Sequence, residues 1–227
     1  MTKVGPFCAH NGPLEELLVH VHCDDEVPDA WIAKHAPDGS LATLWATCNH
    51  VRVLIDLAVL TADHLAVVRA ACACARLVVK HLPAERRATS DAALETAERW
   101  TFGKADVEAL GDAARATEHP YSNEPIDPLV STAASAVEAA VATAAIAAGR
   151  GTRWYDTRQG AEAANHAAIS AAAAMRWADP NRSNESETPE ETEPAEVCPP
   201  LAAVLRAHLP CPSLADVRRG LERLRES

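Results

Sequence analysis

The sequence predicts an all-α protein, an irregular multi-helix bundle of orthogonal and antiparallel helix hairpins. Alanine dominates the composition, and alanine combines the highest helix propensity with a side chain that lets helices approach closely. Apolar residues recur at spacings of three and four over long stretches, which places them on one face of a helix. Alternating β-branched and aromatic runs are scarce, although 48% of the 227 residues are hydrophobic.

Residues 65–100 predict a helical hairpin against which the other helices can pack. The first helix carries a stripe of apolar residues: Leu65, Val68, Cys72, Ala75, Val79 and Leu82. Pro83 ends this helix, because proline has no N–H to donate and crowds the preceding turn. Ser90 or Thr89 is predicted to cap the second helix, whose buried stripe is Ala93, Ala97 and Trp100.

Residues 1–39 form an N-terminal extension in which a helix and a short strand are equally compatible with the pattern. The helical bundle domain is predicted to span residues 40–178. Ser40 is expected to cap one long helix with Leu41, Leu44, Cys48, Val51, Ile55 and Ala58 on one face.

Three further helices are predicted in the second half of this domain. Phe102-Gly103 breaks the hairpin, and residues 105–117 form a helix with Val107, Leu110 and Ala114 directed inward. A proline-rich loop follows, and then two alanine-rich helices at about residues 129–148 and 157–177, separated at Gly149 and Gly151.

Residues 179–197 predict an acidic disordered linker with a net charge of −6. Low hydrophobicity in such a segment cannot offset the entropy lost on ordering. Beyond it, residues 198–227 predict a C-terminal helical hairpin, with Ser213 as the cap of its second helix.

Charge and cysteine content indicate the class of protein. A formal charge of −11 argues against general nucleic-acid binding, which needs a basic face. Neither a signal-peptide core nor a long uncharged run is predicted, so we expect a cytoplasmic protein without a membrane partner. The seven cysteines are then expected to be reduced thiols.

A metal site is the alternative interpretation of the N-terminal extension. Zinc prefers thiolate and imidazole ligands, and these are supplied by Cys8, His10, His20, His22 and Cys23. Their spacing matches no established zinc pattern, so surface histidines and buried thiols are the favoured interpretation. Cys72 and Cys74 point about 200° apart on a helix and are predicted to pack in the core. Cys198 and Cys211 flank a short helix.

Catalytic motifs are missing from the sequence. It has no glycine-rich phosphate loop, no HExxH and no G-x-S-x-G, and its carboxylates form no isolated pair in an apolar stripe. His166 is interpreted as a polar residue at a helix interface. We therefore predict a protein that is not an enzyme and needs no cofactor.

The most unusual polar segment is the junction at residues 149–158. It concentrates Arg150, Arg153, Trp154, Tyr155 and Arg158 between two helices of an acidic protein. Arginine, tryptophan and tyrosine dominate binding hot spots. The competing interpretation is structural: Trp154 would cover the end of the bundle while the arginines bond helix carbonyls. These five residues are the predicted partner-binding site.

Several segments, LWATC, CACARLVV, AALETAERWTFGK and DAARAT, resemble an alanine-rich all-helical family of bacterial immunity proteins from polymorphic toxin systems. The shared order is Cys72, Pro83, Arg86, Arg87, Ala93, Glu95, Trp100 and Gly103, and HAAISAAAAM is similar to that family's closing helix. The resemblance covers residues 41–178. It implies a cytosolic protein that neutralises a cognate toxin and has no catalytic residues.

The sequence therefore predicts a non-enzymatic protein-binding module, an immunity-like protein whose partner is another protein. The alternative is a zinc-binding or redox-linked helical protein that uses the N-terminal Cys/His group. The sequence leaves the oligomeric state open.

Overall fold

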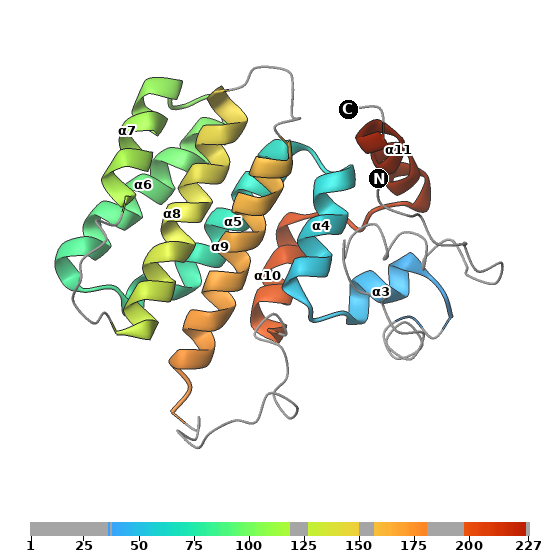
Figure 1. Ribbon diagram of the computed structural model, residues 1–227, viewed down its shortest axis with the longest axis horizontal. Helices are drawn as coiled ribbons and strands as arrows, with labels where there is room; N and C mark the ends of the chain where they lie inside the picture. Colours follow the sequence, from blue (N-terminus) through green and yellow to red (C-terminus); the bar gives the residue numbers. More distant parts are fainter. Residues whose placement is uncertain (1–35, 37, 119–126, 150–156, 181–197, 226–227) are drawn as a thin grey trace, which may run out of the picture.

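The computed structural model describes residues 36, 38–118, 127–149, 157–180 and 198–225. In these residues the regular elements are helices, which confirms the predicted all-α multi-helix bundle (Figure 1). The N-terminal extension and the linker, apart from Ala36, Asp38, Gly39, Asp179 and Pro180, lie outside the described residues. The helices are α3 (Leu41–Thr47), α4 (Val51–Thr61), α5 (His64–Val78), α6 (Ala84–Thr101), α7 (Val107–Thr117), α8 (Pro128–Gly149), α9 (Thr157–Trp177), α10 (Pro199–His208) and α11 (Leu214–Arg225), with a 3-10 turn η1 (Val79–His81) after α5.

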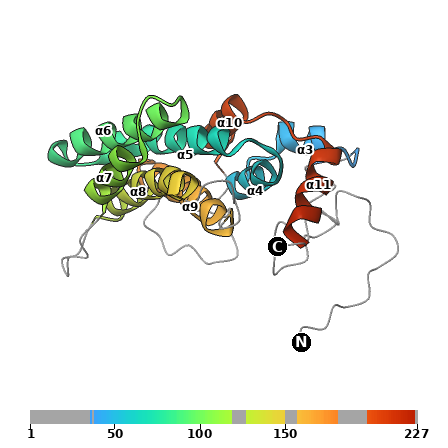
Figure 2. The same ribbon diagram turned by 90° about the horizontal axis from the view of Figure 1, so that it is seen from above.

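The bundle has two layers, which Figure 2 shows from above. One layer holds α6, α5 and α10, and the other holds α7, α8, α9 and α4. Helix α5 joins the layers because it packs against α8, α9, α6 and α10. The most extensive contact is between α8 and α9, where facing alanines such as Ala140 and Ala171 are fully buried. Small side chains let these two helices approach closely.

Helix α8 is long and apolar enough to cross a membrane by length and composition. The helix carries Glu138 at its middle, so it is not a long uncharged run. Half of its apolar window is buried, since α8 packs against α9, α5, α7 and α6. A core helix of a bundle and a membrane span share this composition.

The prediction of one long helix after Ser40 is wrong, because the chain breaks between α3 and α4. Cys48, the C-cap of α3, adopts an extended conformation, and so does His50, the N-cap of α4. The break is occupied by α10: the guanidinium of Arg206 donates to the carbonyls of Trp45 and Cys48, and the Cys198 amide donates to the Asn49 carbonyl. Tertiary hydrogen bonds replace those that a continuous helix would form.

The second helix of the hairpin begins six residues before Ser90, directly after Pro83. Proline suits this position, because the first-turn amides of a helix have no intrahelical acceptor. Glu85 in the first turn favours the helix start electrostatically, and Arg87 donates to the carbonyls of Lys80 and Leu82 across the corner. Ser90 is thus a buried residue within α6 rather than its cap.

The inward face of α7 differs from the prediction. Leu110, Ala113 and Thr117 are buried, whereas Val107 is 54% exposed. Ala114 is partly buried and packs against the core as predicted, so the difference is confined to Val107.

The two C-terminal helices both pack against α4, and of these two described helices only α10 also packs against α5. Ser213 caps α11 as predicted, since its hydroxyl oxygen accepts from the Asp216 amide at 3.1 Å. Cys198 is buried and Cys211 is exposed, and both are free thiols.

Candidate protein-binding surface

The two sequence-predicted sites fall largely outside the described residues. Arg150, Arg153, Trp154 and Tyr155 lie there, and so do Cys8, His10, His20, His22 and Cys23. For Arg158 only the backbone, in the first turn of α9, is described. Both sites therefore remain predictions. The described residues contain another surface that combines exposed aromatic and cationic side chains.

Such a surface lies where α6 ends. Gly103, with φ of 67°, takes the left-handed conformation that closes a Schellman motif. Its amide donates to the Trp100 carbonyl at 2.9 Å, and the Lys104 amide donates to the Arg99 carbonyl at 2.9 Å. A guanidinium nitrogen of Arg99 in turn donates to the Lys104 carbonyl at 3.1 Å. Phe102, at the C-cap between these bonds, has a fixed backbone.

The Phe102 side chain points into solvent with 63% of its surface exposed, the largest exposure among the described large hydrophobic residues. Two cations lie against its ring. The Arg69 guanidinium carbon is 5.6 Å from the ring centroid, and the Lys104 ammonium is 5.9 Å from it. Cation–π attraction at these distances stabilises exposed pairs by about 0.5–1 kcal/mol, which favours this placement of the ring.

Two more apolar residues lie close to Phe102 in the sequence. Trp100 is half-buried and packs against the core, with its ring 6.5 Å from that of His64. Val107 is the exposed apolar residue that begins α7, five positions after Phe102. We name the set of Arg69, Trp100, Phe102, Lys104 and Val107 the Phe102 corner.

Charges at the Phe102 corner are distributed unevenly. In the described part of the chain, no carboxylate lies within ion-pair distance of Arg69, Arg99 or Lys104. The nearby carboxylates of Asp63 and Asp106 instead accept from the first amides of α5 and α7. Four described arginines pair with carboxylates: Arg52 with Asp56, Arg76 with Glu98 and Asp91, Arg115 with Asp112, and Arg219 with Asp216. Three others, Arg87, Arg206 and Arg223, donate to backbone carbonyls instead.

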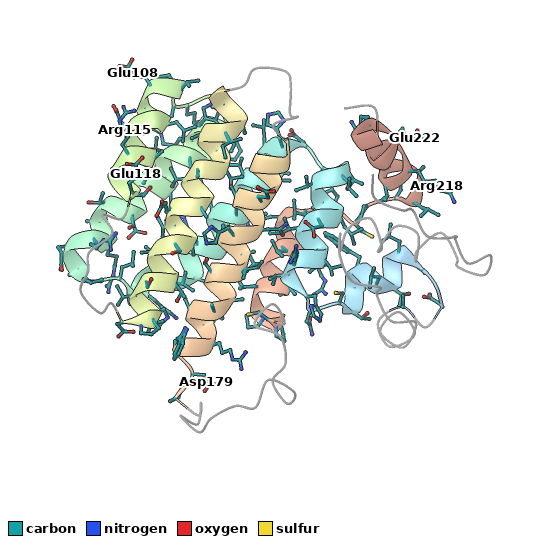
Figure 3. The ribbon with its side chains drawn as sticks, viewed as in Figure 1. Glu108, Arg115, Glu118, Asp179, Arg218 and Glu222 are labelled. Atoms are coloured by element: carbon teal, nitrogen blue, oxygen red, sulfur yellow. The ribbon has the colours of Figure 1, made fainter. Side chains whose placement is uncertain are left out.

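The Phe102 corner lies at the same end of the bundle as the two helix ends that flank the predicted junction. Helices α4 to α9 alternate in direction, so the ends of α6 and α8 and the starts of α7 and α9 share one end of the bundle (Figure 1). Figure 3 labels Glu108 at that end of α7 and Asp179 at the opposite end, after α9.

The buried thiols show no sign of reactivity. Burial raises the pKa of the Cys72 and Cys74 thiols to about 12, and it also raises the pKa of Cys48 and Cys198. A thiol that resists ionisation is a poor nucleophile and a poor metal ligand. The core role predicted for Cys72 and Cys74 is confirmed, since both are fully buried. The described residues hold no group of three or more His, Cys, Asp or Glu side chains arranged to bind a metal ion.

One polar contact joins α4 and α9. The Asn165 amide nitrogen donates to Asp56 Oδ1 at 2.5 Å, and Arg52 lies 3.9 Å from Asp56 Oδ2. The neighbouring His166 is exposed, so it is not the interface residue that the sequence predicted. Asn165 thereby links α9 to α4 through a side-chain hydrogen bond.

Sequence reasoning missed the Phe102 corner because Phe102-Gly103 was interpreted only as a helix break. The local sequence RWTFGK does carry a signal, since two aromatics and two cations fall within six residues. The third cation, Arg69, comes from another helix and becomes apparent only in the fold.

The sequence matches no protein-family model, no curated protein and no solved structure at a significant level.

Proposed function

We propose that this protein is a non-enzymatic, cytoplasmic protein-binding module, and that it acts as an immunity protein that neutralises a cognate bacterial toxin. The immunity role is supported by the resemblance of residues 41–178 to that family. The binding role is supported by one observation above all: Phe102 is exposed to solvent with two cations, Arg69 and Lys104, against its ring.

Rigid exposed aromatics are suited to binding because little conformational entropy remains to be lost. A ring that is 63% exposed leaves apolar area that a covering partner can bury. Aromatic residues and arginines are also the usual anchors of protein interfaces. We propose the Phe102 corner as the described part of the interface, with Arg150, Arg153, Trp154, Tyr155 and Arg158 as further contacts.

The test uses the product of the adjacent reading frame as the partner, co-expressed and co-purified with this protein. Cells that make the neighbouring protein should stop growing unless this protein is also made. Isothermal titration should show that Phe102→Ala weakens the complex by more than about tenfold, as truncation of an anchor does. The helical circular-dichroism spectrum should be unchanged, because the Phe102 side chain is exposed.

The matched control is Trp177→Ala. Trp177 is also an exposed aromatic, at 42%, but it ends α9 at the opposite end of the bundle. Its removal should leave the affinity unchanged. If Phe102→Ala and Trp177→Ala bind equally well, the Phe102 corner is not the interface. If no complex forms and no toxicity is relieved, the immunity role is wrong.

A further inference from the structure

We infer that the Phe102 corner binds a partner segment that presents an apolar side chain flanked by carboxylates. The inference rests on the proposed function and names the chemistry of the partner. It runs against the expectation from net charge, because a protein of charge −11 would by itself favour a basic partner.

Some arginines in the described part of this protein pair with a carboxylate and others do not. Carboxylates outnumber cations in this chain by 32 to 21. Arg76 forms two short hydrogen bonds with Glu98, of 2.7 and 2.8 Å, and Arg115 and Arg219 each pair with an aspartate one turn away. Arg69 and Lys104 have no carboxylate within ion-pair distance among the described residues, as is also true of Arg218, but both of them lie against one exposed aromatic ring.

The carboxylates of Asp106 and Asp63, at the starts of α7 and α5, are already bonded to backbone amides. Asp106 Oδ1 accepts from the Ala109 amide at 2.8 Å, and Asp63 Oδ1 accepts from the Leu65 amide at 3.2 Å. These two carboxylates complete the starts of α7 and α5, where negative charge is favourable. They are therefore held at the helix starts, while the cations at the ring remain available to a partner.

The two cations at the Phe102 ring come from different parts of the fold. Arg69 comes from α5 and Lys104 from the turn after α6, so the ring is flanked by cations from two different elements. A partner that covers Phe102 must approach both cations. Carboxylates beside its apolar group would form charge-assisted hydrogen bonds there, whereas lysines or arginines would be repelled.

The experiment uses a phage-displayed library of random peptides selected on the intact protein. Selected peptides should combine Asp or Glu with a bulky apolar residue. Titration of a synthetic selected peptide should show binding that falls more than about tenfold with Phe102→Ala and also with Lys104→Glu. Lys104 is exposed and follows the helix, so its substitution leaves the fold intact. The pair Arg69→Glu and Lys104→Glu should select basic peptides instead.

The control must separate local from long-range charge. Arg115→Glu with Arg218→Glu changes the net charge by the same amount as the Arg69→Glu and Lys104→Glu pair, on exposed residues of α7 and α11 that Figure 3 labels. This double variant should keep the affinity of the parent protein for the acidic peptide.

Two outcomes would overturn the inference, and they differ from failure of the proposed function. If the peptides depend on Phe102 but carry Lys or Arg, or if Lys104→Glu binds them equally well, the Phe102 corner is an interface for a different partner. If the selected peptides bind Phe102→Ala as well as the parent protein, the Phe102 corner is not an interface and both proposals lose their support.

Discussion

Gly220 lies where α11 crosses the end of α4, and the approach leaves no room for a side chain. A Cβ at this position would stand 3.0 Å from the Cβ of Leu60 and closer still to the Leu60 carbonyl oxygen. The same carbonyl accepts a hydrogen bond of 3.1 Å from the Arg223 guanidinium. A single glycine thus sets the position of a whole helix, since α11 packs on α4 at this point.

Gly220→Ala should therefore destabilise the protein, because backbone has to move to admit the methyl group. The expected loss is about 1–3 kcal/mol, which is typical of overpacking. Urea unfolding measures it, and hydrogen exchange should show faster exchange in α11 than in α5.

Gly111→Ala is the matched control for this substitution. Gly111 is also helical, but the nearest atom to its Cβ would be the end of Arg115 at 3.6 Å, an ordinary contact. Without a clash, alanine should stabilise α7 by about 0.5–1 kcal/mol. Equal effects of the two substitutions would show that the contact at Leu60 can relax at no cost.

At the scale of the element, the C-terminal ends of α3 and α4 are completed by residues far away in the chain. The last carbonyls of a helix lack intrahelical donors. For α3, the Trp45 carbonyl accepts from Arg206 Nε at 2.6 Å, and the Cys48 carbonyl accepts from another nitrogen of the same guanidinium. One planar side chain on α10 therefore ends α3 and redirects the chain into α4.

Arg206→Ala should loosen α3, because both carbonyls lose their donor in a half-buried place. The cost is about 1–3 kcal/mol, the range for leaving buried acceptors unpaired. Arg206→Lys should recover only part of it, since an ammonium cannot bond both carbonyls in the planar geometry of a guanidinium. Denaturant unfolding gives the energies, and hydrogen exchange across residues 41–47 locates the change.

The control is Arg218→Ala, at an exposed arginine of α11, which should leave the free energy of unfolding unchanged. A similar loss of stability there would mean that the loss comes from the removed charge and not from the hydrogen bonds to α3.

The same elements show how far the sequence could predict the fold. Both bounds of α9 and the extent of α8 follow from the sequence, because long alanine-rich periods and flanking glycines are local signals. The break between α3 and α4 could not be predicted, since its cause, Arg206, lies 161 positions from Trp45. The Phe102 corner could be predicted only in part. Phe102 and Lys104 are neighbours in the sequence, whereas Arg69 is contributed by α5 and comes close only in the fold.

On the scale of the whole molecule, the buried thiols connect stability to pH. Burial is the largest cause that raises the pKa of Cys72 and of Cys74, from 9.0 to about 12. Below the unfolded value both states keep their protons and the thiols do not affect stability. As pH rises from 9.0 toward about 12, the unfolded chain loses protons that the folded chain retains. The folded state therefore loses stability in this window.

We predict a fall in the unfolding free energy of about 1.4 kcal/mol per pH unit for each such thiol. Urea unfolding at a series of alkaline pH values measures the slope. Cys72→Ala should make the slope shallower by about one proton, whereas removal of the exposed Cys211 thiol should change it much less. Identical slopes for the parent protein and Cys72→Ala would contradict the buried, protonated state of this thiol.

The hydrogen bonds between α10 and the α3–α4 break also have a consequence for the time course of folding. Arg206 reaches Trp45 across 161 positions, and the Cys198 amide bonds Asn49 beside it. Contacts of such long range form late and slow the search for the native state. On a ribosome that adds about 5–20 residues per second, α3 and α4 wait on the order of ten seconds for the segment that completes them. During that interval the apolar faces of these helices are open to chaperones and proteases, so the earliest part of the bundle to be synthesised is among the last to become native.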